Sequence, residues 1–165
     1  MSIIYGATPV QEQGLAQNMR YDTLGKDSEV FAVYDPITIA SGVLAVAGTT
    51  NTVVGVAQKV ATMPATNDTV YPPYIPVSNG SIYLMGTNSD LTDNETDGGT
   101  YYKLTGSTGT VQVDVTSGVQ TTSSRVVEIV KVDPFLDGGS GSGSGLRKCY
   151  VRFVKTPYTN VTITA

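Results

Sequence analysis

The chain has 165 residues, which is enough for one domain with a sizeable core and argues against several domains. It contains no histidine and only one cysteine, which excludes Ser-His-Asp and Cys-His catalytic relays, histidine-ligated metal centres and intramolecular disulfides. The formal net charge is −4, and no basic stripe marks a surface for nucleic acid. We therefore expect no nucleic acid, no metal and no cofactor among the ligands.

The composition favours β-structure. Charged residues make up only 15% of the chain, and serine and threonine supply much of the remaining polarity. The abundant threonine and valine are β-branched residues that suit a pleated sheet and form helices poorly. The first residues lack the basic and apolar segments of a secretory signal, and no apolar run is long enough to cross a bilayer. We expect an all-β protein that is made in the cytoplasm and works without a membrane.

Residues 1–28 differ from the remainder of the chain. Their apolar residues follow neither the period of a helix nor the two-residue period of a strand. This pattern predicts an extended arm, and such an arm can add a strand to the exposed sheet edge of a partner, where backbone hydrogen bonds give affinity and alternating side chains give specificity. The alternative is a terminus without fixed structure. The residues expected to contact the partner are Ile3, Ile4, Tyr5, Pro9 and Val10.

From residue 29 onward, short apolar runs alternate with turn residues, which is the pattern of consecutive strands. The expected strands span residues 29–35, 37–39, 43–47, 53–60, 75–77, 81–85, 100–105, 110–116, 125–132 and 146–155. No helix of ordinary length is expected. The pattern predicts a small β-barrel, a β-tulip-like domain or a sandwich over residues 29–165, preceded by the arm.

Turn residues suggest how some strands connect. Ser41-Gly42 marks a turn, residues 48–51 are expected to join 43–47 to 53–60 in a hairpin, and Asn79-Gly80 predicts a second hairpin between 75–77 and 81–85. Three prolines in residues 71–76 remove backbone donors, so this stretch is expected at a sheet edge or in a connector. The Gly/Ser run 138–145 reads as a loop joining the last two strands.

Candidate chemical sites are few. The acidic stretch 90–99 resembles the start of a calcium loop, but Leu104 stands where an EF-hand requires glutamate, which leaves a different cation site or a solvated loop. Glu128 is expected to face solvent, and Cys149 alternates with Val151 and Phe153 as a core residue would. We therefore expect no catalytic site and no enzyme.

Tyrosine is the dominant aromatic residue, with ten copies and no tryptophan. Tyr5, Tyr71, Tyr74 and Tyr158 lie in proline-flanked or irregular segments. Such amphipathic rings either serve a partner surface or cap the ends of a barrel. The sequence leaves both interpretations open.

The core of the chain carries a glycine and valine rhythm. Its elements are Gly42-Val43, the run Val53 to Ala57 with the letters VVGVA, and the stretch Val77 to Ile82 with the letters VSNGSI. This rhythm resembles that of head decoration (capsid cement) proteins of tailed bacteriophages. The strands at 125–134 and 147–153 look like the closing strands of the same kind of domain.

The resemblance implies a structural, non-enzymatic virion protein that sits on the outer surface of a capsid and stabilises it. Its partners would be the major capsid protein and further copies of itself, with a trimer favoured, and an N-terminal arm would pair with a capsid strand. It would be made in the host cytoplasm. The alternative is a carbohydrate-binding or adhesive β module of a phage tail fibre or surface protein, with the Tyr-rich connector 71–76 as its sugar platform.

Overall fold

The computed structural model describes residues 4–11, 19–49, 51–78, 80–91, 99–132 and 146–157. It confirms the all-β class: 46% of the structure is strand, and the described residues contain no α-helix. Among these residues, the 3-10 turn η2 covers Thr122–Ser124. The strands are β1 (Thr8–Gln11), β2 (Val30–Phe31), β3 (Pro36–Ala40), β4 (Val43–Val46), β5 (Gly55–Ala57), β6 (Ala61–Thr62), β7 (Tyr74–Pro76), β8 (Ile82–Leu91), β9 (Thr100–Thr105), β10 (Gln112–Asp114), β11 (Val127–Val132) and β12 (Leu146–Phe153).

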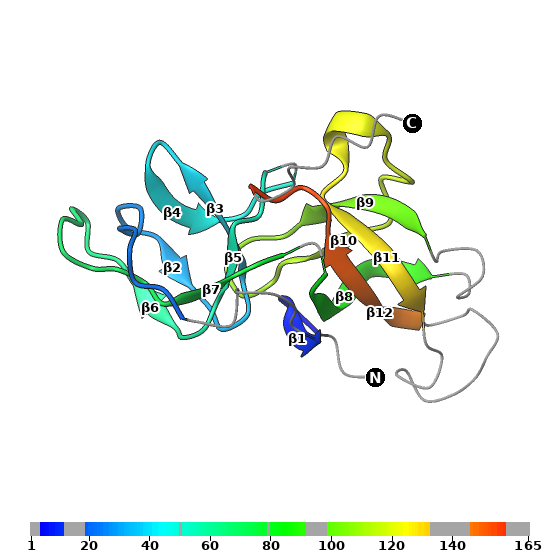
Figure 1. The fold of residues 1–165 in the computed structure, drawn as a ribbon, viewed down its shortest axis with the longest axis horizontal. Helices are drawn as coiled ribbons and strands as arrows, with labels where there is room; N and C mark the ends of the chain where they lie inside the picture. The colour runs from blue at the N-terminus through cyan, green and yellow to red at the C-terminus, as the bar shows by residue number, and fades with distance from the viewer. Residues whose placement is uncertain are drawn as a thin grey trace.

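A closed barrel forms the C-terminal part of the molecule (Figure 1). Its five strands are hydrogen-bonded in the order β8, β10, β9, β11 and β12, and the pairing of β12 with β8 completes the ring. β8 is long enough to serve three neighbours, because it also carries the short antiparallel strand β1 at Ile82 to Leu84. Of the barrel, the β-tulip-like domain and the sandwich that the sequence left open, the structure contains a barrel, and we call residues 80–157 the barrel.

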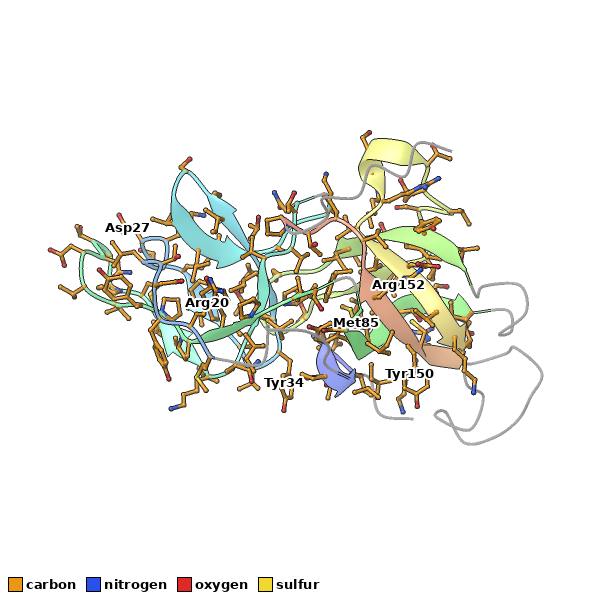
Figure 2. The ribbon with its side chains drawn as sticks, in the orientation of Figure 1. Arg20, Asp27, Tyr34, Met85, Tyr150 and Arg152 are labelled. Atoms are coloured by element: carbon orange, nitrogen blue, oxygen red, sulfur yellow. The ribbon has the colours of Figure 1, made fainter. Side chains whose placement is uncertain are left out.

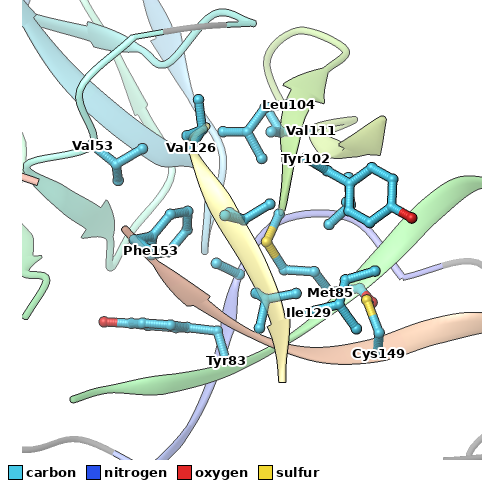
Figure 3. Packing of buried hydrophobic residues seen from close by; sticks show 14 of the residues in the cluster. Val53, Tyr83, Met85, Tyr102, Leu104, Val111, Val126, Ile129, Cys149 and Phe153 are labelled. Carbon is cyan, nitrogen blue, oxygen red and sulfur yellow. The ribbon is translucent and has the colours of Figure 1, made fainter. Parts of the chain in front are cut away.

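Every second side chain along the strands points into the barrel and fills its interior. On β12, Cys149, Val151 and Phe153 are fully buried, as a strand with one face on the core requires. The rings of Tyr83 and Phe153 meet in a tilted arrangement with centroids 5.2 Å apart, and Met85 lies beside them (Figure 3). Cys149 is thus a core residue, as the sequence predicted.

A second lobe, residues 19–78, is built around a four-stranded sheet in the order β4, β3, β5 and β7. We call it the N-terminal lobe. β3 and β4 form a hairpin whose turn residues Ser41 and Gly42 both have positive φ, 51° and 84°, as a type I′ turn requires. The inner face covers a small core of seven buried residues, which are Phe31, Ile37, Leu44, Val54, Ala57, Met63 and Tyr74.

Residues 19–28, which the sequence placed in the arm, lie on this lobe and cover both edges of its sheet. Arg20 forms an antiparallel bridge with Tyr74 on β7, and Gly25 forms a parallel bridge with Leu44 on β4. A Cβ on Gly25 would stand 2.3 Å from Sδ of Met63, so a larger residue there would require the flexible Met63 side chain to move. The segment therefore shields the backbone of two edge strands from other chains.

Two expected hairpins are wrong. β4 pairs with β3 and not with β5, so residues 43–47 and 53–60 are not neighbours. β7 belongs to the four-stranded sheet and β8 to the barrel, so the chain around Gly80 crosses between two sheets instead of reversing within one. Local turn chemistry cannot distinguish these cases, because the pairing of β7 with β5 is a long-range choice.

Other expectations about connectivity hold. The proline-rich stretch supplies β7, which is the last strand at one side of its sheet. β11 and β12 pair antiparallel, as expected for the last two strands. β10 pairs antiparallel with β9, and Val111 and Val113 are fully buried on one face. The Gly/Ser run 138–145 lies outside the described residues.

Candidate partner-binding surface

Four of the five residues predicted to bind a partner are described, and Ile3 lies outside the described residues. Tyr5 and Val10 expose 41% and 53% of their surface, so both are open to contact. Ile4 and Pro9 are partly covered, and Pro9 is opposite Tyr83 in the pairing of β1 with β8. The structure thus offers Tyr5 and Val10 as exposed contacts and holds Ile4 and Pro9 against the barrel.

The backbone of residues 4–11 is bound to its own chain. The amide of Gly6 donates to the carbonyl oxygen of Val111 at 2.8 Å, and the amide of Ala7 donates to that of Tyr34 at 2.8 Å. Ala7 is fully buried and belongs to the core cluster of the barrel. The described parts of residues 1–28 are therefore packed on the domain, while strand addition to a partner stays a prediction.

Two glycines make room for this segment. A Cβ on Gly86, in the middle of β8, would stand 2.0 Å from the carbonyl oxygen of Ile4. Gly6 has a φ of +73°, and a Cβ there would stand 2.7 Å from the carbonyl oxygen of Tyr34. A glycine inside an apolar strand is a recognised sign of close backbone approach. Gly86 was therefore the available signal that residues 4–7 lie on the barrel.

The two lobes meet at Asp35, which is fully buried. Its carboxylate accepts hydrogen bonds from the amide of Ala32 at 2.8 Å and from the amide of Gly109 at 3.0 Å. Beside it, the hydroxyl of Thr108 donates to the carbonyl oxygen of Val30 at 2.7 Å. Burial raises the pKa of Asp35, and the two amide donors offset only part of that effect. The turn between β9 and β10 is thereby fastened to the N-terminal lobe.

A charged row crosses the outer face of the barrel, and the sequence did not reveal it. Tyr101 on β9, Glu128 on β11 and Arg152 on β12 are directly opposite one another in the pairing, and Glu128 forms an ion pair with Arg152. Glu128 was expected to face solvent; it does lie on the outer face, but its side chain is only 12% exposed. The guanidinium of Arg125 lies over the Tyr101 ring, 4.3 Å from its centroid.

Asp114 anchors the loop after β10. Its carboxylate accepts hydrogen bonds from the hydroxyl of Ser117, from the hydroxyl of Thr116 at 2.8 Å and from the amide group of Asn88 at 2.7 Å. Burial acts to raise the pKa of Asp114, but these hydrogen bonds together hold it below the usual value. The site is a structural brace, because all of these donors come from the loop and the adjoining strand β8.

The two tyrosines of the proline-rich connector differ in burial. Tyr71 is 43% exposed, whereas Tyr74 is only 5% exposed and belongs to the lobe core. The Tyr74 hydroxyl donates to Asp22 at 2.8 Å. Burial and the Asp22 carboxylate raise the pKa of Tyr74 to about 12, and the same hydrogen bond lowers the pKa of Asp22. Tyr71 and Tyr74 therefore do not form one aromatic platform, and Tyr158 lies outside the described residues.

The acidic stretch 90–99 is described only at its ends. Asp90 forms an exposed ion pair with Arg147, with 2.6 Å between Oδ1 and Nε. Residues 92–98 lie outside the described residues, so the possible cation site there stays a prediction. Within the described ranges, no three acidic or cysteine side chains gather closely enough to hold a metal ion. In the same ranges, no helix has the length and apolar character needed to span a bilayer.

Comparison with known proteins adds no family assignment: no protein-family model matches the chain, and no curated protein matches it significantly.

Proposed function

We propose that this protein is a structural virion protein that binds the outside of a phage capsid and stabilises it. The observation that carries the proposal is the exposure of Tyr5 and Val10 on a segment whose backbone is already fixed by the barrel. A contact that is ordered before binding loses little conformational entropy when the partner arrives. The glycine and valine rhythm in residues 42–82 supports the same family of proteins.

The proposed partner is the major capsid protein, and the proposed contact needs no catalytic group. A capsid presents the same surface many times, and copies that also touch one another multiply a modest individual affinity. The outer face of a closed barrel suits such a role, because the ring of β8 to β12 has satisfied its own backbone pairing. The oligomer expected on the lattice is a trimer.

The test uses capsids of the phage that encodes this chain, prepared without the protein. Val10→Asp should reduce the number of bound copies by roughly tenfold, since a charge would replace an apolar contact at the interface. Val119→Asp is the matched control, because Val119 is 57% exposed and belongs to the segment between β10 and η2, and Figure 1 shows η2 on the side of the barrel opposite β1. Cosedimentation measures binding, and cryo-electron microscopy of decorated particles locates the added density.

The outcomes separate two errors. If the wild-type protein leaves capsids undecorated and their thermal stability unchanged, the proposed function is wrong. If the wild type binds and Val10→Asp binds equally well, the function stands but residues 4–11 do not make the contact.

The alternative, a carbohydrate-binding or adhesive module, has weaker support because Tyr74 is buried in the lobe core. Only Tyr71 of the connector pair is open to a sugar ring. Glycan-array binding that disappears in Tyr71→Ala would favour this alternative.

A further inference from the structure

The chain contains two Asp–Pro peptide bonds, Asp35-Pro36 and Asp133-Pro134. A peptide bond of this kind breaks more readily in mild acid than others do, because the aspartate carboxyl can reach its own carbonyl carbon and the tertiary proline nitrogen leaves easily once it is protonated. The first bond leads into β3, which begins at Pro36, and the second lies outside the described residues. The surroundings of the first bond decide whether the fold protects it or activates it.

The backbone immediately before the first bond is strained. Tyr34 has a φ of 69°, in the left-handed region that a bulky side chain rarely adopts. Its amide donates to the carbonyl oxygen of Ala57 and its carbonyl oxygen accepts from the amide of Ala7, both at 2.8 Å. Figure 2 shows Tyr34 where the N-terminal lobe meets the barrel. Breaking the neighbouring bond would let Tyr34 relax, and strain of this kind is concentrated at functional sites.

Hydrogen bonds also prepare the groups that would react. The carbonyl oxygen of Asp35 accepts from the amide of Ala57 at 2.9 Å, which polarises the carbonyl carbon and would stabilise the oxyanion formed on attack. In the carboxyl group, Oδ2 accepts from the amides of Ala32 and Gly109, whereas Oδ1 accepts from Gly109 alone. Oδ1 is therefore the less engaged oxygen and the better placed nucleophile.

The carboxyl group of Asp35 lies where it retains its proton. Burial raises the pKa of Asp35, and the Glu29 carboxylate acts in the same direction. The turn 106–109 and β5, which both donate hydrogen bonds to Asp35, contain no charged residue that would oppose this effect. The acid form, which carries the proton that the leaving nitrogen needs, therefore persists to higher pH in the folded protein than in the unfolded chain.

We infer that the fold promotes self-cleavage of the peptide bond between Asp35 and Pro36, driven in part by the strain at Tyr34. Oδ1 of Asp35 attacks its own carbonyl carbon, the bond to the nitrogen of Pro36 breaks, and the carboxyl proton passes to that nitrogen. A cyclic anhydride remains at Asp35. One water molecule, entering past the partly exposed turn 106–109, opens the anhydride to two carboxylic acids. The inference goes beyond the proposed function and does not depend on capsid binding.

The first experiment incubates the purified full-length protein at about pH 5, between the ordinary pKa values of aspartate and histidine. Fragments are measured by mass spectrometry under denaturing conditions, because the contacts of residues 19–28 with β4 and β7 should hold the two pieces together. The expected products are residues 1–35 and 36–165. Asp133-Pro134 is the internal control, since it has the same chemistry elsewhere in the chain. In the native protein, cleavage at Asp35-Pro36 should be about tenfold faster, and in guanidinium chloride the two rates should become similar.

The second experiment uses variants that separate the chemistry from the strain. Asp35→Asn removes the acid and should abolish cleavage at this bond. Tyr34→Gly keeps the acid and the proline but removes the strain, because glycine adopts positive φ without a steric cost, and it should slow cleavage by about tenfold. Ser41→Gly is the matched control: it relieves a φ of 51° in the turn between β3 and β4, and cleavage should proceed at the wild-type rate. Denaturant unfolding establishes that each variant is folded.

Four results would overturn the inference: a native protein that stays intact at Asp35-Pro36, equal cleavage at the two Asp–Pro bonds, equal rates at Asp35-Pro36 in native and denatured protein, or Tyr34→Gly that cleaves as fast as the wild type. The first three use the wild type alone, so they decide the matter even where a variant does not fold. None of them bears on whether the protein decorates capsids, and failure to decorate capsids would leave the fragment pattern unchanged.

Discussion

The barrel and the N-terminal lobe are of similar size but solve the problem of exposed strand edges differently. The barrel closes its ring through the pairing of β12 with β8. The lobe keeps an open sheet and covers its edges with residues 19–28. Among the described residues, twelve large apolar side chains are exposed, of which eight lie in the lobe and two in the barrel. The barrel, whose edge strands pair with each other, thus exposes fewer large apolar side chains in the described residues than the lobe, whose edge strands are covered by residues 19–28.

The lobe also depends on the barrel more than the barrel depends on it. The lobe core holds seven buried residues, whereas the larger cluster holds nineteen. Val53, Val56 and Val77 come from the lobe segment but are buried in the larger cluster. A unit with a small core of its own is marginally stable. The lobe should therefore unfold before the barrel.

The largest expected effect tests this dependence with two phenylalanines, each fully buried. Phe153→Ala in the barrel should lower the free energy of unfolding by about 4 kcal/mol and destabilise both lobes in one transition. Phe31→Ala should cost a similar amount but should loosen the lobe alone, because its neighbours belong to the smaller cluster. Native-state hydrogen exchange resolves the two cases residue by residue. Equal loss of protection in the barrel of Phe31→Ala would show one cooperative unit.

The next effect concerns the segment that leads into the barrel. Gly86→Ala should cost about 3 kcal/mol, because the new Cβ would collide with the backbone oxygen of Ile4 and has no alternative rotamer. Gly118→Ala is the control: its φ of +73° makes alanine strained, but the space around it is open, so about 1 kcal/mol is expected. Denaturant unfolding measures both values.

The two variants should also differ in which backbone amides exchange faster with solvent. Exchange of the amides of Gly6 and Ala7 should accelerate in Gly86→Ala and stay slow in Gly118→Ala. If exchange at residues 4–11 is the same in both variants, the close approach at Gly86 does not hold this segment in place.

Sequence reasoning succeeded where the relevant physics is local. Alternation identified the strands around Val113 and Val151, and the turn at Ser41-Gly42 followed from the residues that tolerate positive φ. Prolines placed β7 at a sheet edge, because each proline lacks a backbone donor. These features depend on neighbouring residues and are therefore visible in one sequence.

It failed where the outcome depends on distant segments. No short sequence pattern determines whether β7 pairs with β5, as it does, or with β8. The docking of residues 4–11 was missed because the segment lacks a period, while its evidence sits at Gly86 on another strand. The charged row from Arg125 to Arg152 required the register of three strands.

The smallest expected effect concerns the carboxylate that joins the two lobes. Burial raises the folded-state pKa of Asp35 above its usual value, and the neighbouring carboxylate of Glu29 acts in the same direction. The folded protein therefore holds this proton more tightly than the unfolded chain does. Linkage then requires the contribution of Asp35 to stability to grow as pH falls toward the ordinary aspartate range, and to diminish as pH rises through the raised pKa.

Asp35→Asn removes this titration and leaves the remaining groups unchanged. The free energy of unfolding of the wild type, measured against that of the variant, should increase as pH is lowered from 7 toward 4. Asp114 and Asp22, whose folded pKa values are lowered, act in the opposite direction at more acidic pH, and they do so in both proteins. Their effects therefore cancel in the difference. Parallel pH profiles of the two proteins would mean that the carboxylate between the lobes is solvated, and that the lobes separate there more readily than its burial implies.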